Sequence, residues 1–380
     1  MQNIQESKLG ILGGGQLGRM FIQAALDYNI DVHILDPDPQ APCKNVATEF
    51  VTGELTDYDT VYKFGKQCDL LTSEIENVNT DALKALESEG IPVYPQPHIV
   101  ELIKDKRLQK SFYKDHCIPT ADFTLVESKD DISKLDRYPA VNKLGKEGYD
   151  GRGVQVLHSK EDLDKAFDAP GLIEELVDFE KEIAVIVARN KDGECVTFPV
   201  VEMVFHPTAN LVEYLFSPAD ISNKAATAAD QIARNVINTL DMTGLLAVEM
   251  FLTKDGRVLV NEVAPRPHNS GHQTIEGNIT SQYEQHLRSI FNLPLGDTST
   301  RSRAAMVNLL GEAGYTGNAY YEGLHKVTAL GGVHVHLYGK KLTKPFRKMG
   351  HVTIEENDMD ELRKKVHLVK EQLKVKTRNE

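Results

Sequence analysis

The stretch VNKLGKEGYDGRGVQVL, residues 141–157, joins two strand-like segments through a loop that is rich in glycine. The flanking segments, Ala140–Leu144 and Val154–Leu157, predict a β-hairpin. Three glycines within residues 148–153 allow the loop backbone to bring its N–H groups over phosphates. Lys143, on the first strand, can reach the same phosphates as a point charge. The stretch therefore predicts a hairpin that closes over a phosphorylated ligand, with a plain solvent-exposed turn as the alternative.

A second predicted hairpin carries two carboxylates. The segments Leu245–Leu252 and Val258–Val263 are strand-like, and the turn Lys254-Asp255-Gly256 joins them. Glu249 and Glu262 are nearly equidistant from this turn, so we expect them to face each other across the strand pair. Two like charges in that position destabilise a sheet without a cation, and Mg²⁺ prefers a few carboxylates together with substrate phosphates. The hairpin therefore predicts a magnesium site, with two carboxylates on a wet face as the alternative.

The first hundred residues alternate between strand-like and helix-like segments. We expect strands at Leu9–Leu12, Asp31–Leu35, Glu49–Thr52, Asp69–Thr72 and Ile91–Tyr94, and helices near Gln16–Tyr28, Asp57–Gly65 and Thr80–Glu89. This alternation is typical of a doubly wound parallel sheet with helices on both faces.

The turn after the first of these strands reads GGGQLG, residues 13–18, and opens a helix. A helix N-terminus offers free N–H groups and a positive dipole to an anion. Asp36 ends the second strand, roughly 20 residues on, where a dinucleotide-binding fold contacts the ribose. These residues permit a dinucleotide site, but many doubly wound sheets that bind no nicotinamide also open on a glycine-rich turn. Nothing later in the chain supports hydride transfer.

The pattern changes after the proline-rich boundary at Pro92–Pro97, and short strands dominate from about residue 119. Further strands are expected at Leu172–Leu176, Glu182–Arg189 and Val196–Val200, and helices at Ser222–Leu240 and Asp358–Leu373. The expected fold class is therefore α/β and α+β in several domains, with a doubly wound domain first and a small β-rich domain last.

The loop after the second carboxylate strand is dense in hydrogen-bond donors. It can bind a phosphate, a carboxylate or a sugar through Arg266, His268, Asn269 and Ser270. Prolines and glycines exclude the helix on which His268 and His272 would converge on zinc. Five basic side chains also gather between Lys340 and Lys348, which predicts an anion site or a solvated basic face.

The composition restricts the class of protein. Of 380 residues, 41% are hydrophobic and 26% are charged, which excludes a disordered chain. The net charge is 43 − 56 = −13, so we expect no nucleic-acid or membrane partner. No run approaches 18 apolar residues, and the first apolar stretch is too short for a signal peptide. Four widely spaced cysteines fit a reduced, cytoplasmic protein.

A lid hairpin with a preceding lysine, followed by two carboxylates on a late hairpin, is the arrangement of the ATP-grasp ligases. The motifs GGGQLGRM, EIENV, GYDGRG, NEVAPRPHNSGH and FRKMGH occur here in one order. Together they resemble the N5-carboxyaminoimidazole ribonucleotide synthases of purine biosynthesis, from about residue 8 to residue 355.

This resemblance implies ATP-dependent carboxylation of 5-aminoimidazole ribonucleotide by bicarbonate through carboxyphosphate, with release of ADP and phosphate. It implies ATP and Mg²⁺ at the site and a cytoplasmic homodimer. Phosphoryl transfer of this kind is catalysed mostly by positioning and charge neutralisation.

The resemblance also implies roles for individual residues. It places ATP contacts at Arg107, Lys143, Gly148, Tyr149, Asp150, Gly151, Arg152, Gly153, Val154, Glu174, Glu175, Leu176, Val177, Glu182, His206, Asn261 and Glu262. It places ribonucleotide contacts at Gly15, Gln16, Leu17, Glu76, Tyr149, Arg152, His268, Asn269, Ser270, Lys340 and Arg347. It places the metal ligands at Glu249 and Glu262, and the carboxylation chemistry on Asp150, Arg152 and Lys340.

Three domains follow from the same resemblance. Residues 1–104 would form a Rossmann-like domain, residues 105–300 an ATP-grasp domain with a lid at about 119–178, and residues 301–380 a β-rich domain that completes the substrate site. Two positions depart from the family pattern: Glu147 stands where the lid has the first of two glycines, and no asparagine precedes His206.

Three other functions remain compatible with parts of the chain. One is an ATP-grasp ligase with another acceptor, such as a formate-dependent purine transformylase, because the basic cluster from Lys340 to Lys348 favours a phosphorylated acceptor but does not distinguish the two ligases. A nicotinamide-dependent dehydrogenase would use residues 13–18 and Asp36. A non-catalytic nucleotide sensor is disfavoured because Lys143, Asp150 and both metal-binding glutamates are present.

Overall fold

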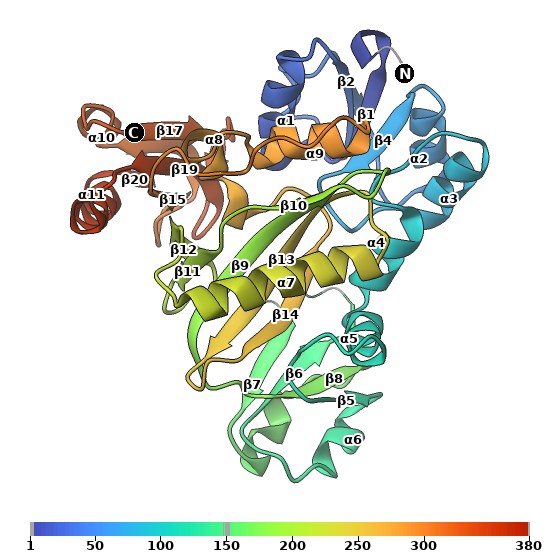
Figure 1. Cartoon of the computed structure of the whole chain (residues 1–380), viewed down its shortest axis with the longest axis vertical. Coiled ribbons are helices and arrows are strands. Elements are labelled where there is room, and N and C mark those ends of the chain that lie inside the picture. Colours follow the sequence, from blue (N-terminus) through green and yellow to red (C-terminus); the bar gives the residue numbers. More distant parts are fainter. Residues whose placement is uncertain (1–3, 147, 149–152, 379–380) are drawn as a thin grey trace.

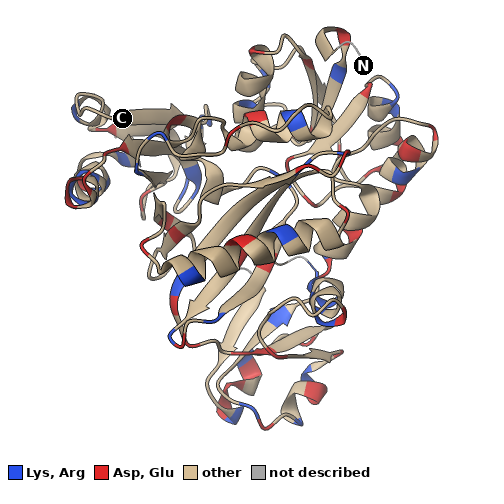
Figure 2. Cartoon of the chain, viewed as in Figure 1, with Lys and Arg blue, Asp and Glu red and all other residues tan. Residues whose placement is uncertain are grey.

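The computed structural model describes residues 4–146, 148 and 153–378. Figure 1 shows a central twisted sheet with a further unit on each of three sides. The N-terminal unit lies at the upper right, a small sheet lies at the bottom, and the C-terminal segment lies at the left. Charged residues are spread over the outer helices and loops, whereas most of each central strand is uncharged (Figure 2).

The N-terminal unit is a parallel sheet of four strands with helices packed on it, as the alternating pattern predicts. Its strands follow the order β3-β2-β1-β4 and comprise β1 (Lys8–Leu12), β2 (Asp31–Asp36), β3 (Glu49–Thr52) and β4 (Leu70–Ser73). Its helices are α1 (Gln16–Leu26), α2 (Tyr58–Gly65) and α3 (Thr80–Ser88), after the short 3₁₀ helix η1 (Ile4–Glu6).

One expected strand is wrong. Residues Ile91–Tyr94 make only a single parallel bridge, between Val93 and Leu71, at the edge of β4. Pro92 and Pro95 have no N–H groups to continue a ladder, so pairing stops after one bridge.

A small antiparallel sheet follows two connecting helices, α4 (Pro97–Lys104) and α5 (Lys106–Asp115). Its order is β5-β8-β6-β7, with β5 (Phe123–Val126), β6 (Ala140–Leu144), β7 (Val154–Leu157) and β8 (Gly171–Glu175). The helix α6 (Lys129–Ser133) and the 3₁₀ helix η2 (Lys160–Lys165) pack beside it. β6 and β7 pair as the predicted hairpin, whereas β5 was not foreseen.

The central sheet has nine strands in the described part of the chain. Its order is β14-β13-β9-β11-β12-β15-β19-β17, and β10 pairs with β9. The strands are β9 (Phe179–Arg189), β10 (Cys195–Thr197), β11 (Val201–Phe205), β12 (Val212–Ser217), β13 (Gly244–Thr253), β14 (Val258–Ala264), β15 (Ala304–Leu310), β17 (Val333–Leu337) and β19 (Lys348–Glu355). β10 overlaps the expected strand Val196–Val200 but ends at Thr197, because Pro199 cannot continue the ladder, and β11 and β12 are not predicted from the sequence.

Buried apolar side chains hold this sheet against its helices. Residues 183–188 of β9 are at most 2% exposed, as a strand covered on both faces requires. The long helix α7 (Asn223–Thr239) packs Ala229, Ala233 and Val236 against one face (Figure 1). The helix α9 (Gln282–Ile290) contacts β13 and also α1, which joins the central sheet to the N-terminal unit.

The last eighty residues are rich in strands, as expected, and β15, β17 and β19 continue the central sheet. A further small sheet has the order β18-β16-β20, with β16 (Gly317–Glu322), β18 (Leu342–Thr343) and β20 (Lys374–Thr377). The helices of this region are α10 (Leu324–Val327) and α11 (Met359–Gln372), and the short helices η3 (Asn269–Gly271) and α8 (Thr274–Gly277) precede it.

All four cysteines carry free thiols. Among the helices of residues 4–146, 148 and 153–378, none is both long enough and apolar enough to cross a bilayer.

Three histidines are fully buried between the units. His286 of α9 bonds Thr72 Oγ1 at 3.0 Å, and His351 of β19 bonds the hydroxyl of Tyr338 at 3.0 Å. Burial lowers the pKa of both imidazoles and of His272, whose pKa the nearby charges of His268 and Lys348 lower further. These histidines are therefore neutral in the folded protein at neutral pH.

This burial predicts a loss of stability in mild acid. Below pH 6.5 the unfolded chain binds protons at these histidines and the folded chain does not, so unfolding becomes more favourable as the pH falls. The three sites together should lower the free energy of unfolding by about 4 kcal/mol between pH 7.5 and pH 5.5. In His286→Gln, this decrease should be about 1.4 kcal/mol smaller, as measured by urea denaturation at both pH values. The control is His98→Gln, at an exposed position of α4, which should keep the full decrease.

Candidate active site

The two predicted metal ligands lie opposite each other in the central sheet. Glu249 of β13 and Glu262 of β14 are register partners, as their distances from the turn predicted. Burial raises the pKa of the Glu249 carboxyl, and the charge of Glu262 raises it further. The ammonium of Lys106 holds the pKa of Glu262 well below its usual range. The two carboxyls therefore differ in proton affinity, and Glu249 is the one that binds a proton more readily.

Each carboxylate contacts a basic side chain of the protein. His268 Nε2 lies 3.2 Å from Glu249 Oε1, and Lys106 Nζ contacts Glu262. Burial alone would lower the pKa of Lys106, but Glu262 outweighs burial and raises it. Lys106 is thus a candidate for the active site, although the family resemblance names its neighbour Arg107 and not Lys106.

The neighbouring Arg107, which the family resemblance proposed for ATP, points elsewhere. Its guanidinium pairs with Asp105 at 2.7 Å and lies 3.9 Å from Glu127. The helical period of α5 accounts for the difference, since Lys106 and Lys110 are four residues apart on one face and Arg107 lies outside that row. That period was the available signal for Lys106.

A second cluster joins the small sheet to β14. Lys143 Nζ of β6 lies 2.6 Å from Glu174 Oε2 of β8 and 2.9 Å from Asn261 Oδ1 of β14. Lys110 Nζ lies 2.7 Å from the other oxygen of Glu174. Burial would raise the pKa of Glu174, but the two lysines outweigh it and lower that pKa. The structure therefore brings three of the expected ATP contacts together.

The remaining expected ATP contacts lie around this cluster. Glu182 of β9 is the register partner of Phe251 of β13, two residues from Glu249, and burial and the charge of Glu262 raise the pKa of its carboxyl to about 7. Glu175 ends β8, and Leu176 and Val177 follow it directly. The Nδ1 of His206 accepts backbone N–H groups of its own turn at 3.3 Å, and its ring centre lies 5.4 Å from that of Phe346.

The lid loop is described only at its ends. Tyr149, Asp150, Gly151 and Arg152 lie outside the described residues, as does Glu147. Gly153 has a φ of +74°, and a Cβ there would lie 3.1 Å from the Cα of Gly148. The two ends of the loop therefore approach each other closely, which requires glycine at residue 153.

The glycine-rich turn of the N-terminal unit is filled by carboxylates of the chain. The backbone N–H groups of Gly15 and Gly18 donate to Glu74, and that of Gly14 donates to Asp36 Oδ2 at 2.6 Å. These amides are the ones that a bound pyrophosphate would need. Asp36 is turned towards this loop instead of projecting to a ribose, so the geometry argues against the dinucleotide alternative.

The expected ribonucleotide contacts line the junction of three units. Glu76, three residues after β4, pairs with Arg266 Nε at 2.8 Å. In the same loop, Ser270 Oγ and His268 Nδ1 are 2.9 Å apart, and the amide of Asn269 pairs with that of Asn308 of β15.

The basic segment of the C-terminal region reaches this junction through a stack of rings. Lys340 Nζ donates to the carbonyl of Lys348 at 2.8 Å and lies 5.7 Å from the centre of the Tyr338 ring. Tyr338 bonds His351, whose ring centre lies 4.8 Å from that of His272. Arg347 turns its guanidinium to the carbonyl of Leu342 at 2.8 Å. Successive ring contacts therefore connect the segment of Lys340 with His272, which follows the loop of Arg266.

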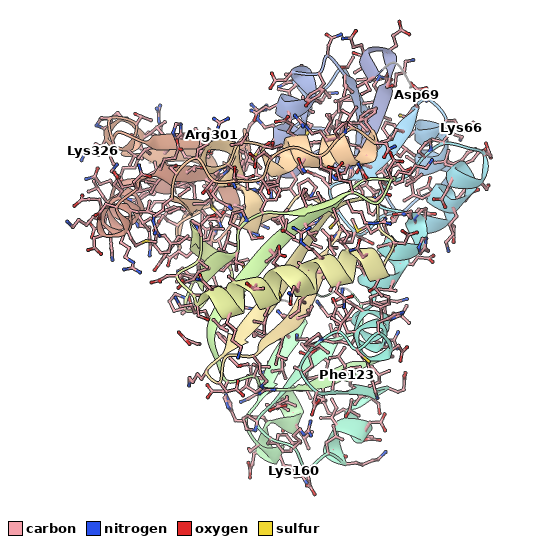
Figure 3. All side chains as sticks on the ribbon, in the orientation of Figure 1. Lys66, Asp69, Phe123, Lys160, Arg301 and Lys326 are labelled. Carbon is pink, nitrogen blue, oxygen red and sulfur yellow. The ribbon has the colours of Figure 1, made fainter. Side chains whose placement is uncertain are left out.

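The site thus lies where residues of the small sheet, the N-terminal unit and the central sheet meet, and the side chain of Glu262 is 40% exposed there. The labelled side chains Lys66, Lys160 and Lys326 mark the outer edges of the three units in Figure 3.

The donor set fits a magnesium ion that ATP helps to bind. Across the described ranges, no group of three or more His, Cys, Asp or Glu side chains could hold a metal ion. Glu249 and Glu262 supply two opposed carboxylates, and the charged phosphates of a nucleotide would supply the further oxygen ligands that Mg²⁺ needs.

Family models match nearly the whole chain. Residues 6–104 match the ribonucleotide synthetase preATP-grasp domain, residues 111–283 the ATP-grasp domain, and residues 304–365 the phosphoribosylaminoimidazole carboxylase C-terminal domain. Among curated proteins, the chain is 40% identical to the chloroplastic phosphoribosylaminoimidazole carboxylase of Vigna aconitifolia over 92% of its own length. The chain spans 64% of the length of that relative.

Two solved structures are similar throughout. The N5-carboxyaminoimidazole ribonucleotide synthetase of Thermotoga maritima is 41% identical with a TM-score of 0.92, and the match covers 98% of this chain and 100% of that one. The N5-carboxyaminoimidazole synthase of Aspergillus clavatus, solved with ADP and 5-aminoimidazole ribonucleotide, is 32% identical with a TM-score of 0.89. That match covers 98% of this chain and 99% of the other.

The placement of α5 predicts unequal effects at its first two residues. Lys106→Met should weaken ATP binding by about 10-fold or more, because it removes the ammonium beside Glu262. Arg107→Met should change ATP binding less than about 3-fold, because its guanidinium pairs with Asp105 and faces Glu127. Calorimetric titration with magnesium ATP measures both, and a larger loss in Arg107→Met would show that the sequence-based assignment was right.

Proposed function

Because the chain belongs to the N5-carboxyaminoimidazole ribonucleotide synthase family of ATP-grasp ligases, we propose that it uses ATP to carboxylate 5-aminoimidazole ribonucleotide with bicarbonate. The products are N5-carboxyaminoimidazole ribonucleotide, ADP and phosphate. The observation that carries this proposal is the meeting of Lys106, Lys143, Glu174 and Glu262 between the small sheet and β14. This is a site for phosphates beside carboxylates, next to the strand β6 that leads into the glycine-rich segment.

The chemistry requires activation of a weak electrophile. Bicarbonate attacks the γ-phosphorus of ATP, ADP leaves, and carboxyphosphate forms. Carboxyphosphate then breaks its C–O bond to give CO₂ and phosphate, and the exocyclic amine of the ribonucleotide attacks the carbon. The amine nitrogen loses a proton as the C–N bond forms. A closed site is needed, because water would otherwise destroy carboxyphosphate or let CO₂ escape.

The lysines of the chain position the phosphates in this proposal. Lys143 is fixed from two sides, by Glu174 and Asn261, so its ammonium is held in one place before ATP binds. Lys106 lies beside Glu262, where the phosphates and the carboxylates come closest. Both ammonium groups are thus in position before the reaction begins, and this preorganisation lowers the barrier to phosphoryl transfer.

The proposal includes a magnesium ion, for which Glu249 and Glu262 would be the protein ligands. A bound Mg²⁺ would neutralise charge on the phosphate oxygens. The two carboxylates would hold it beside Lys106 and His268, which contact them here.

The acceptor side rests on residues from three units. Glu76 and Arg266 form an ion pair beside the loop of His268, and Lys340 approaches from the C-terminal region. Asp150 and Arg152 complete this side in the family resemblance. We assign the ribonucleotide to this junction and the carboxylation chemistry to Asp150, Arg152 and Lys340. The homodimer and the cytoplasmic location also remain proposals that rest on the resemblance.

The carboxylase relatives are longer than this chain, and the proposal covers only the synthase reaction. The synthase reaction and a formate-dependent transformylase reaction can be distinguished by the substrates that they require. Release of ADP should require magnesium ATP, bicarbonate and 5-aminoimidazole ribonucleotide together, and omission of any one should abolish it. Release with formate in place of bicarbonate would replace this function by a transformylase.

The metal assignment predicts the effect of a nearly isosteric change. Glu262→Gln should lower ATP cleavage by about 100-fold or more, since a neutral amide cannot balance a divalent cation. The fold should persist, because Lys106 is the one side chain in the described part of the protein that hydrogen-bonds to Glu262. The control is Glu127→Gln, at an exposed carboxyl near Arg107, which should retain turnover. Near-normal turnover of Glu262→Gln would refute the metal assignment.

A further inference from the structure

Lys110 is a buried lysine that the proposed mechanism does not use. It lies on α5, and only 3% of its side chain is exposed. Its Nζ lies 2.7 Å from Glu174 Oε1 and donates to Thr120 Oγ1 at 2.5 Å. The other oxygen of the same carboxylate takes Lys143 at 2.6 Å. One buried carboxylate is therefore shared by two ammonium groups.

Because the two lysines share one carboxylate, the triad of Lys110, Glu174 and Lys143 has a net charge of +1. Glu174 with Lys143 alone would be a neutral pair, and the ammonium of Lys143 would be drawn fully to the carboxylate. With Lys110 on the second oxygen, Glu174 is divided between two cations, and Lys143 keeps positive charge for another anion. Because a buried ion pair is often no more stable than an apolar replacement, the stability of the fold alone does not account for Lys110.

Lys110 also links the elements that surround Lys143. Thr120, which accepts from Lys110, donates to the carbonyl of Val260 in β14 at 2.7 Å. The next residue of that strand, Asn261, accepts from Lys143 at 2.9 Å. Lys110 is therefore connected to Lys143 by two sets of polar contacts, one through Glu174 and one through Thr120 and β14.

We propose that Lys110 is a positioning residue for ATP binding, which divides the Glu174 carboxylate so that Lys143 presents a charged, fixed ammonium to the nucleotide phosphates. This inference rests on the proposed function, in which Lys143 contacts those phosphates. Lys110 itself is enclosed by Glu174 and Thr120 and need not touch the nucleotide.

The charged groups around Lys110 make this arrangement sensitive to pH. Glu174 faces it from β8, Lys143 from β6 and Lys106 from its own helix. Burial lowers the pKa of Lys110 to about 8, and the two neighbouring ammonium groups oppose the attraction of Glu174. As the pH rises through this value, Lys110 loses its proton and the triad becomes neutral.

The test is direct binding of magnesium ATP to the full chain, by calorimetry at pH 7. Lys110→Met should weaken binding by about 10-fold, because Lys143 then forms a one-to-one pair with Glu174. The matched control is Lys114→Met, an exposed lysine one turn further along α5, which should bind as the unaltered chain does. Lys110→Gln, which removes the charge but keeps a hydrogen-bond donor, should behave like Lys110→Met.

Two further readouts separate positioning from a merely structural role. The difference in affinity between the unaltered chain and Lys110→Met should shrink from pH 7 to pH 9, since deprotonation of Lys110 produces the same neutral pair. Adding Glu174→Gln to Lys110→Met should recover part of the lost affinity, because it frees Lys143. Thermal unfolding of every variant establishes that the chain is folded during these titrations.

The outcomes are distinct for the inference and for the proposed function. If the unaltered chain binds no ATP, the proposed function fails. If the unaltered chain binds ATP, and both Lys110 variants bind ATP as tightly as the unaltered chain does at pH 7, the inference is overturned. A loss that is constant from pH 7 to pH 9 and is not relieved by Glu174→Gln also overturns it, because that result describes damage to the fold.

Discussion

The facing carboxylates of Glu249 and Glu262 impose the constraint on which the site depends. Two adjacent strands place them opposite each other, where burial and the charge of Glu262 raise the pKa of Glu249, so that the pair is stabilised by a cation. The protein meets this constraint from different elements, with Lys106 at the start of α5 and His268 in the loop after β14. The approach of α5 to the sheet is therefore an electrostatic requirement as much as a packing one. Whatever binds there must bring positive charge of its own or use these side chains.

The same balance extends from β14 into the small sheet. Lys106, Lys110 and Lys143 come within reach of Glu174 and Glu262, so an acidic chain of net charge −13 gathers three lysines at one place. Each lysine is held by a carboxylate, yet the network retains charge for phosphates because two lysines share Glu174. Buried ion pairs of this kind contribute little to stability, so their value lies in holding the site ready before the nucleotide arrives.

The sequence predicts those parts of the site that local pattern determines. The alternating strands and helices gave the N-terminal sheet, and equal distances from one turn gave the register of Glu249 and Glu262. It missed Lys106, because the motif comparison favoured its neighbour and only the orientation of α5 separates the two. It also missed β11 and β12, and it assigned a strand to residues 91–94, where prolines leave one bridge. The causes differ: the contact of Lys106 with Glu262 joins residues 156 positions apart, whereas the prolines at residues 92 and 95 end the strand locally.

The glycine-rich turn gives the sharpest case of this dependence. Residues 13–18 open a helix as in a dinucleotide-binding fold, but the occupant of the helix N-terminus is Glu74, which lies 59 residues from Gly15 in the chain. A carboxylate held by two backbone amides fixes the end of β4, and Glu76, two residues on, then meets Arg266 at the junction of the units. The anion-binding geometry is used here to anchor a loop. The same physical preference that predicted a bound phosphate therefore explains how the N-terminal unit orients one side of the acceptor site.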